Sequence, residues 1–84
     1  WQDIMYTVYV LKSTKDNNLY IGCTSNLEKR LVEHHDGKVF STKSRRPFKL
    51  LYKEKFHDKY EAFKKEGYYK TAKGKKELKN KINQ

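Results

Sequence analysis

The chain has 84 residues, of which 36% are hydrophobic and 14% aromatic, and its 20 lysines and arginines exceed its 10 acids to give a formal net charge of +10. This length suits one small domain, and the apolar residues come in bounded runs that argue against disorder. No run approaches the roughly 20 apolar residues of a membrane span, and a single cysteine excludes an internal disulfide and a Cys-rich metal site. We expect no membrane association.

The expected setting is reducing and cytoplasmic, near the nucleoid in a bacterium, and the expected partner of so basic a chain is nucleic acid. Met5 follows Trp-Gln-Asp-Ile, so residues 1–4 are expected to be extraneous or disordered. Residues 5–84 are then expected to form the single domain.

The first predicted element is a β-hairpin over residues 6–24, in which two β-branched and aromatic runs flank the turn-forming stretch Ser-Thr-Lys-Asp-Asn-Asn. Two registers of this hairpin are possible, and in both of them Tyr9 and Tyr20 share one face of the sheet. A two-residue turn at Asn17-Asn18 leaves them about 20 Å apart along the strands. A four-residue loop at 13–16 sets them directly opposite each other.

The first predicted helix begins with a capping box of Ser25 and Glu28 and runs to about Asp36. Arg30 and His34 lie one turn apart on it, at the edge of the face that packs on the sheet. Arginine suits phosphate oxygens, and histidine can transfer protons. The alternative for either residue is a packing role.

The second predicted helix, over residues 59–70, begins with a capping box of Asp58 and Glu61. A helical wheel puts Glu66 in the middle of the apolar stripe that includes Ala62. A carboxylate there is costly unless it is ion-paired or holds a cation. Both interpretations remain open from the residues alone.

The rest of the chain completes the predicted fold class. Residues 37–46 are a polar, basic loop, residues 48–56 alternate loosely like a third strand, and a last helical segment has Gly74 near its start. The order β-β-α-β-α-α predicts an α+β domain with a small three-stranded antiparallel sheet flanked by helices.

Basic side chains gather in two stretches, one between the two predicted helices and one near the end of the chain. Such stretches favour weak, salt-sensitive binding to a phosphate backbone. The residues predicted to contact nucleic acid are Lys43, Arg45, Arg46, Lys70, Lys73, Lys75 and Lys76.

Four stretches in order resemble one family. Thr-Val-Tyr at 7–9 and Tyr-Ile-Gly at 20–22 resemble the paired motif of the GIY-YIG nuclease domain, Leu-Glu-Lys-Arg-Leu at 27–31 resembles its arginine helix, and Glu-Ala-Phe-Lys-Lys-Glu at 61–66 its glutamate helix. The likeness covers about residues 5–82. It is greatest to the standalone form, which is similar to the N-terminal domain of the bacterial excinuclease C protein.

The resemblance implies divalent-metal-dependent cleavage of DNA phosphodiester bonds, in repair or recombination. It implies that Tyr9 deprotonates or positions the attacking water and that Tyr20 lies beside Tyr9. It also implies that Arg30 contacts the phosphate and that Glu66 holds Mg²⁺ or Mn²⁺. His34 matches a histidine found in some branches. A protein partner is expected to supply target choice, because attached domains usually do so in this family.

Two departures and two alternatives accompany this resemblance. Thr7 replaces the first motif glycine, and Gly67 inside the glutamate helix is expected to loosen it or to make room for substrate. Gly22 is expected to keep the sheet surface low for a DNA backbone. The alternative functions are a nucleic-acid-binding module of the same fold without catalysis and a basic protein–protein adaptor; RNA is an alternative to DNA.

Overall fold

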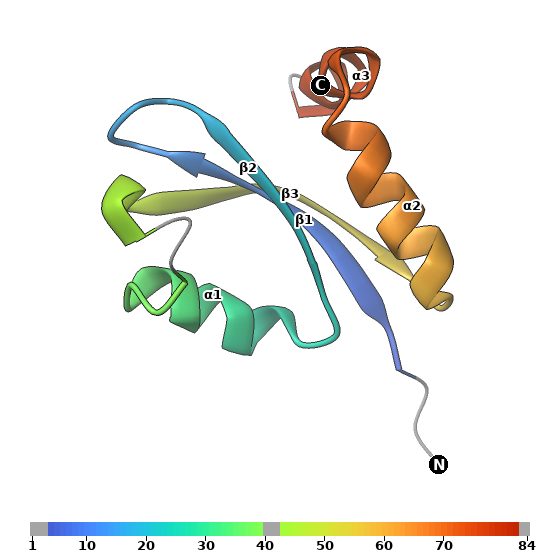
Figure 1. Cartoon of the computed structure of the whole chain (residues 1–84), viewed down its shortest axis with the longest axis horizontal. Coiled ribbons are helices and arrows are strands. Elements are labelled where there is room, and N and C mark those ends of the chain that lie inside the picture. Colours follow the sequence, from blue (N-terminus) through green and yellow to red (C-terminus); the bar gives the residue numbers. More distant parts are fainter. Residues whose placement is uncertain (1–3, 40–42, 83–84) are drawn as a thin grey trace.

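The computed structural model in Figure 1 describes residues 4–39 and 43–82, so residues 1–3 of the expected N-terminal extension lie outside it. The elements are β1 (Tyr6–Ser13), β2 (Leu19–Thr24), α1 (Leu27–His35), the 3₁₀ helix η1 (Lys43–Arg45), β3 (Phe48–Phe56), α2 (Lys59–Tyr69) and α3 (Ala72–Ile82). The α+β class and the predicted order of elements are confirmed. Within these ranges no helix has the length and apolar character needed to cross a membrane.

The sheet has the order β2-β1-β3 with antiparallel pairs, so β1 is central and β2 is an edge. In Figure 1, α1 lies on one side of the sheet and α2 with α3 on the other. Alternation along β1 therefore serves two layers. One face packs into the core under α2 and α3, which consists of Val8, Val10, Ile21, Ala62, Tyr69 and Leu78. The other face carries Tyr9 toward α1.

The hairpin register differs from both predicted registers. Tyr9 pairs with Gly22, and Leu11 pairs with Tyr20. The two tyrosines share a face, as predicted, but they are diagonal neighbours rather than distant or directly opposite. Diagonal positions on one face are still within contact range of aromatic side chains.

The cause of this register is Ser13, which belongs to β1 rather than to the loop. Its backbone N–H donates to the Asn18 carbonyl at 3.0 Å, and its Oγ accepts from the N–H groups of Lys15 and Asp16 at 3.1 and 3.3 Å. Asn17 closes the turn with a φ of 61°, a conformation that asparagine tolerates. The loop is thus shifted by one residue from the predicted 13–16.

The α1 cap also differs from its prediction by one residue. Asn26, not Ser25, is the N-cap, and its side chain accepts from the backbone N–H of Lys29 at 3.1 Å. The predicted end is confirmed, since α1 stops at His35 and Gly37 follows with a φ of 76°. For α2 the predicted cap is correct, because Asp58 accepts from the backbone N–H of Tyr60 at 2.9 Å.

Two helix glycines predict opposite effects of the same substitution. A Cβ at Gly67 meets nothing within 4 Å, so neither packing nor space requires that glycine. A Cβ at Gly74 would collide with the backbone carbonyl of Tyr68 and lie 2.8 Å from the Cα of Tyr69. We expect Gly67→Ala to raise the free energy of unfolding by up to about 1 kcal/mol. We expect Gly74→Ala to lower it by about 1–3 kcal/mol.

Urea unfolding of both variants beside the unsubstituted protein measures these changes. Shifts of the midpoint in the same direction would contradict the packing of α3 against the end of α2.

Candidate active site

Three rings from three elements meet on the α1 side of the sheet. Tyr9 comes from β1, Tyr20 from β2 and His34 from α1, and their ring centroids are 6.4, 5.8 and 5.1 Å apart for the pairs Tyr9–Tyr20, Tyr9–His34 and Tyr20–His34. The Tyr9 hydroxyl lies 3.0 Å from Nε2 of His34, whose residue is only 1% exposed. The structure therefore brings together three of the predicted site residues.

Gly22 makes room for the Tyr9 ring. A Cβ at Gly22 would lie 2.5 Å from both Cζ and the hydroxyl oxygen of Tyr9. Because Gly22 pairs with Tyr9 on the edge strand β2, the phenol lies across β2 toward the outer edge of the sheet. The space that the sequence assigned to a DNA backbone is thus occupied by the phenol.

Arg30 approaches the same hydroxyl from α1. Its side chain is 37% exposed and lies 3.8 Å from the Glu33 carboxylate. Interaction with the Tyr9 hydroxyl is the main cause that raises the pKa of Arg30, and burial opposes it. Burial nevertheless dominates at the phenol and raises the pKa of Tyr9 to about 12, although Arg30 opposes this rise. Tyr9 is therefore a protonated donor at neutral pH.

His34 is the matching acceptor. Burial lowers the pKa of its imidazole, the positive charge of Arg30 lowers it further, and Glu33 opposes both. A neutral imidazole accepts at one ring nitrogen and donates at the other. In the tautomer whose proton is on Nδ1, Nε2 accepts from the Tyr9 hydroxyl.

This pair predicts how stability depends on pH. The pKa of His34 lies below its unfolded value of about 6.5, so its contribution is complete above that pH and is lost as the pH falls through the folded pKa. The pKa of Tyr9 is raised to about 12, so its contribution is lost as the pH rises from about 10. Thermal unfolding from pH 5 to 11 should show a plateau between these limits. A His34→Gln variant should lose the acidic limb selectively.

Glu66 lies on α2, in the layer on the other side of the sheet. Its side chain is 22% exposed and pairs with Lys70 at 3.8 Å. Its negative charge contributes to the raised pKa of Tyr9 and, after burial, to that of Cys23. Glu66 is at the edge of the apolar stripe rather than in its middle, because Phe63 on that side is 45% exposed. The carboxylate and the phenol are thus electrostatically linked across two layers.

Comparison with known proteins identifies the family of this chain. A family model described as the GIY-YIG catalytic domain matches residues 5–83. The chain belongs to the GIY-YIG family. It is 45% identical over 73 residues to UPF0213 protein SH2523 of Staphylococcus haemolyticus, which covers 86% of this chain and 88% of that protein. It is 47% identical over 72 residues to UPF0213 protein YazA of Bacillus subtilis, covering 83% and 72%.

A solved structure supports the same assignment. The solution NMR structure of UPF0213 protein BH0048 from Bacillus halodurans is similar, with a TM-score of 0.58 and 32% identity, over 90% of this chain and 83% of that one. The name UPF0213 specifies no activity, so the link to nucleases comes from the GIY-YIG domain.

GIY-YIG nucleases typically use divalent metal ions, and the donor set of this GIY-YIG domain suits a hard cation. Among the described residues, no three His, Cys, Asp or Glu side chains gather as a metal cluster. A single carboxylate still suits Mg²⁺ or Mn²⁺, because waters and substrate phosphate oxygens supply the remaining ligands of such an ion. The side chain that would hold it is Glu66, whose charge already acts on the Tyr9 hydroxyl.

The predicted nucleic-acid contacts in the loop before β3 lie in two environments. Arg46 donates to the backbone carbonyls of Lys43 and His35 at 3.0 and 3.2 Å, which fixes the loop to the end of α1. Arg46 and Lys43 also line a hollow of about 520 Å³ with Lys15. Arg45 faces a different groove.

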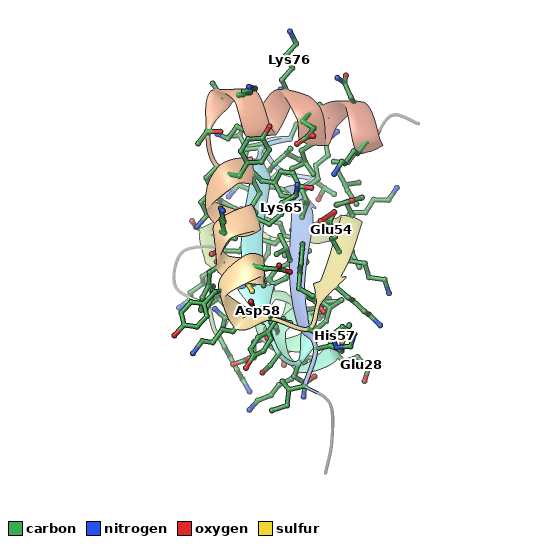
Figure 2. All side chains as sticks on the ribbon, turned by 90° about the vertical axis from the view of Figure 1, so that its right-hand side faces the viewer. Glu28, Glu54, His57, Asp58, Lys65 and Lys76 are labelled. Carbon is green, nitrogen blue, oxygen red and sulfur yellow. The ribbon has the colours of Figure 1, made fainter. Side chains whose placement is uncertain are left out.

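The predicted nucleic-acid contacts near the end of the chain also lie in different environments. Lys70 is ion-paired with Glu66, and Lys73 is exposed. Lys76 points outward from α3 in Figure 2. Lys75 instead lines a groove with Lys79, a residue that the sequence did not single out. Their four-residue spacing on one helix was the available signal.

Proposed function

We propose that this GIY-YIG domain is a divalent-metal-dependent endonuclease that hydrolyses DNA phosphodiester bonds, in the cytoplasm and in DNA repair or recombination. The observation that supports this most is that one buried hydroxyl, that of Tyr9, lies 3.0 Å from the imidazole of His34 and near enough to the Arg30 guanidinium for each to shift the other's pKa. Packing alone requires neither. The charge of Glu66 acts on the same hydroxyl.

Tyr9 and His34 form a path for one proton. With a pKa of about 12, Tyr9 has no phenolate to offer at neutral pH. It can accept a proton from the attacking water as it passes its own proton to Nε2 of His34, 3.0 Å away. The water oxygen bonds to phosphorus, the P–O bond to the leaving oxygen breaks, and that oxygen takes a proton from solvent. Tyr20 packs against the edge of His34 and keeps its orientation.

Arg30 and Glu66 would act on the phosphate. The part-exposed guanidinium of Arg30 can hydrogen-bond a non-bridging oxygen as negative charge develops there. Glu66 would hold Mg²⁺ or Mn²⁺, which neutralises phosphate oxygens when bound.

Arg30→Ala is expected to lower cleavage more than it lowers binding. Loss of one group that stabilises developing charge reduces the rate by about 10²- to 10³-fold, whereas one lost phosphate contact is a small part of a distributed interaction. Single-turnover cleavage and fluorescence anisotropy give the two quantities. Lys29→Ala, an exposed cation on the same helix, is the control and should change the rate little. Equal losses of rate and affinity for Arg30→Ala would assign it to binding alone.

The proposed activity is tested by incubating the protein with supercoiled plasmid, branched DNA and RNA, each with Mg²⁺, Mn²⁺ or EDTA. We expect nicking of DNA with either metal and none with EDTA. Cleavage of RNA alone would correct the substrate class. Binding without cleavage of any of the three would leave a nucleic-acid-binding module in place of a nuclease.

A further inference from the structure

A basic groove lies at the tip of the β1–β2 hairpin. It has a volume of about 340 Å³, and it is lined by Asn17, Asn18, Leu19, Arg45, Lys75 and Lys79. The hairpin, η1 and α3 supply these side chains, so the two basic stretches that are separate in the sequence meet here. Leu19, the first residue of the edge strand β2, forms part of the wall.

Arg45 is held in place within this groove. Its Nε donates to Asp16 at 3.1 Å, and its guanidinium lies 5.9 Å from the centre of the Phe48 ring. Its backbone carbonyl accepts from the Ser13 hydroxyl at 2.6 Å. A fixed guanidinium loses little conformational entropy when it binds a phosphate.

Lys75 and Lys79 carry positive charge that the protein does not neutralise. They are four residues apart on α3, where like charges repel each other. Within residues 4–39 and 43–82, neither has an ion-pair partner. The helix that carries them is anchored, because Lys81 donates to the Tyr69 hydroxyl at 2.9 Å and lies 3.7 Å from Glu54. Three cations with one carboxylate partner thus converge on an open groove.

We propose that this groove binds backbone phosphates of the nucleic-acid substrate, outside the candidate active site. The choice of nucleic acid as ligand rests on the proposed function. Leu19, which lines the groove, and Tyr20, which contacts His34 in the candidate active site, are consecutive residues of the edge strand β2 and point to its two faces, so the groove and the site lie on either side of this edge. A strand that follows the free edge of β2 therefore contacts both. Among the residues that the structure describes, Leu19 is the only large apolar side chain in the lining, so the groove suits a backbone rather than a base.

Four lysines of α3 allow a matched test. Lys75→Gln/Lys79→Gln removes two charges inside the groove, and Lys73→Gln/Lys76→Gln removes two from the same helix outside its lining. Figure 2 shows Lys76 pointing away from the rest of the protein. Affinity for a fluorescent DNA duplex is measured by anisotropy in EDTA at several salt concentrations, and thermal unfolding checks that both variants fold.

The groove variant is expected to reduce the slope of log affinity against log salt by about 1.8, the value for two lost phosphate contacts on duplex DNA. The outer variant should change it by less than half as much. Equal slopes for the two variants would overturn the proposal that the groove binds backbone phosphates. If the slopes differ but the unsubstituted protein cuts no DNA with either metal, the groove stands and the nuclease proposal fails. If it cuts DNA and the slopes are equal, the nuclease proposal stands and the groove proposal fails.

Discussion

Replacing Tyr9 by phenylalanine is expected to reduce the single-turnover rate of DNA cleavage by about 10²- to 10⁴-fold, the range for loss of a proton-transferring group. The substitution removes one oxygen and with it the hydrogen bond to Nε2 of His34. DNA affinity should stay within about twofold, because the Tyr9 residue is only 1% exposed and its loss removes no positive charge. Quench-flow cleavage and anisotropy on one preparation provide both numbers.

Tyr52 offers a matched control for that loss. Its hydroxyl also has a pKa raised to about 12, and it donates to Glu54 at 2.8 Å, but on the opposite layer of the fold. Tyr52→Phe should lower stability by only about 0.5–1.5 kcal/mol, because the Glu54 carboxylate still accepts from the Tyr69 hydroxyl at 3.3 Å and lies 3.7 Å from Lys81, and it should leave cleavage unchanged. Equal cleavage losses in the two variants would show that Tyr9 acts through stability.

Gly22→Ala is expected to lower cleavage although it leaves every proposed site residue in place. The new Cβ would lie 2.5 Å from Cζ and the hydroxyl of Tyr9, so the phenol must move from His34. Crowding of this kind costs about 1–3 kcal/mol of stability. Urea unfolding and the cleavage assay measure the two effects together.

Gly67→Ala is the control for Gly22→Ala, since the same added methyl group meets nothing within 4 Å at Gly67. It should cleave DNA normally. A Gly22→Ala protein with normal stability and normal cleavage would contradict the position of the Tyr9 ring.

Local sequence signals predict the strands and helices well in this chain. The bounds of β3 and the Asp58 cap of α2 follow from alternation and capping chemistry, which act within a few residues. The hairpin register could not be predicted from these local signals, because serine is a residue type that is common in turns and Ser13 is therefore assigned to the loop. In the structure its hydroxyl donates to the Arg45 carbonyl, a contact between residues 32 positions apart.

The same distinction applies to the candidate site. Alternation predicts that Tyr9 and Tyr20 share a face, and the family motifs predict Arg30 and Glu66 as its partners. The filling of the space above Gly22 by the Tyr9 phenol depends on a side-chain conformation. The meeting of Arg45 with Lys75 depends on how η1 and α3 pack around the hairpin. Neither is encoded in local spacing.

The central claim is that Glu66 serves metal-dependent cleavage and is more than the partner of Lys70 in an ion pair at 3.8 Å. Glu66→Gln and Lys70→Gln both break that pair, but only the first removes the carboxylate. The decisive measurement is the single-turnover cleavage rate at saturating DNA as a function of Mg²⁺ concentration. We predict a loss of at least about 10²-fold for Glu66→Gln and an unchanged metal dependence for Lys70→Gln. Equal rates for the two variants would contradict the claim.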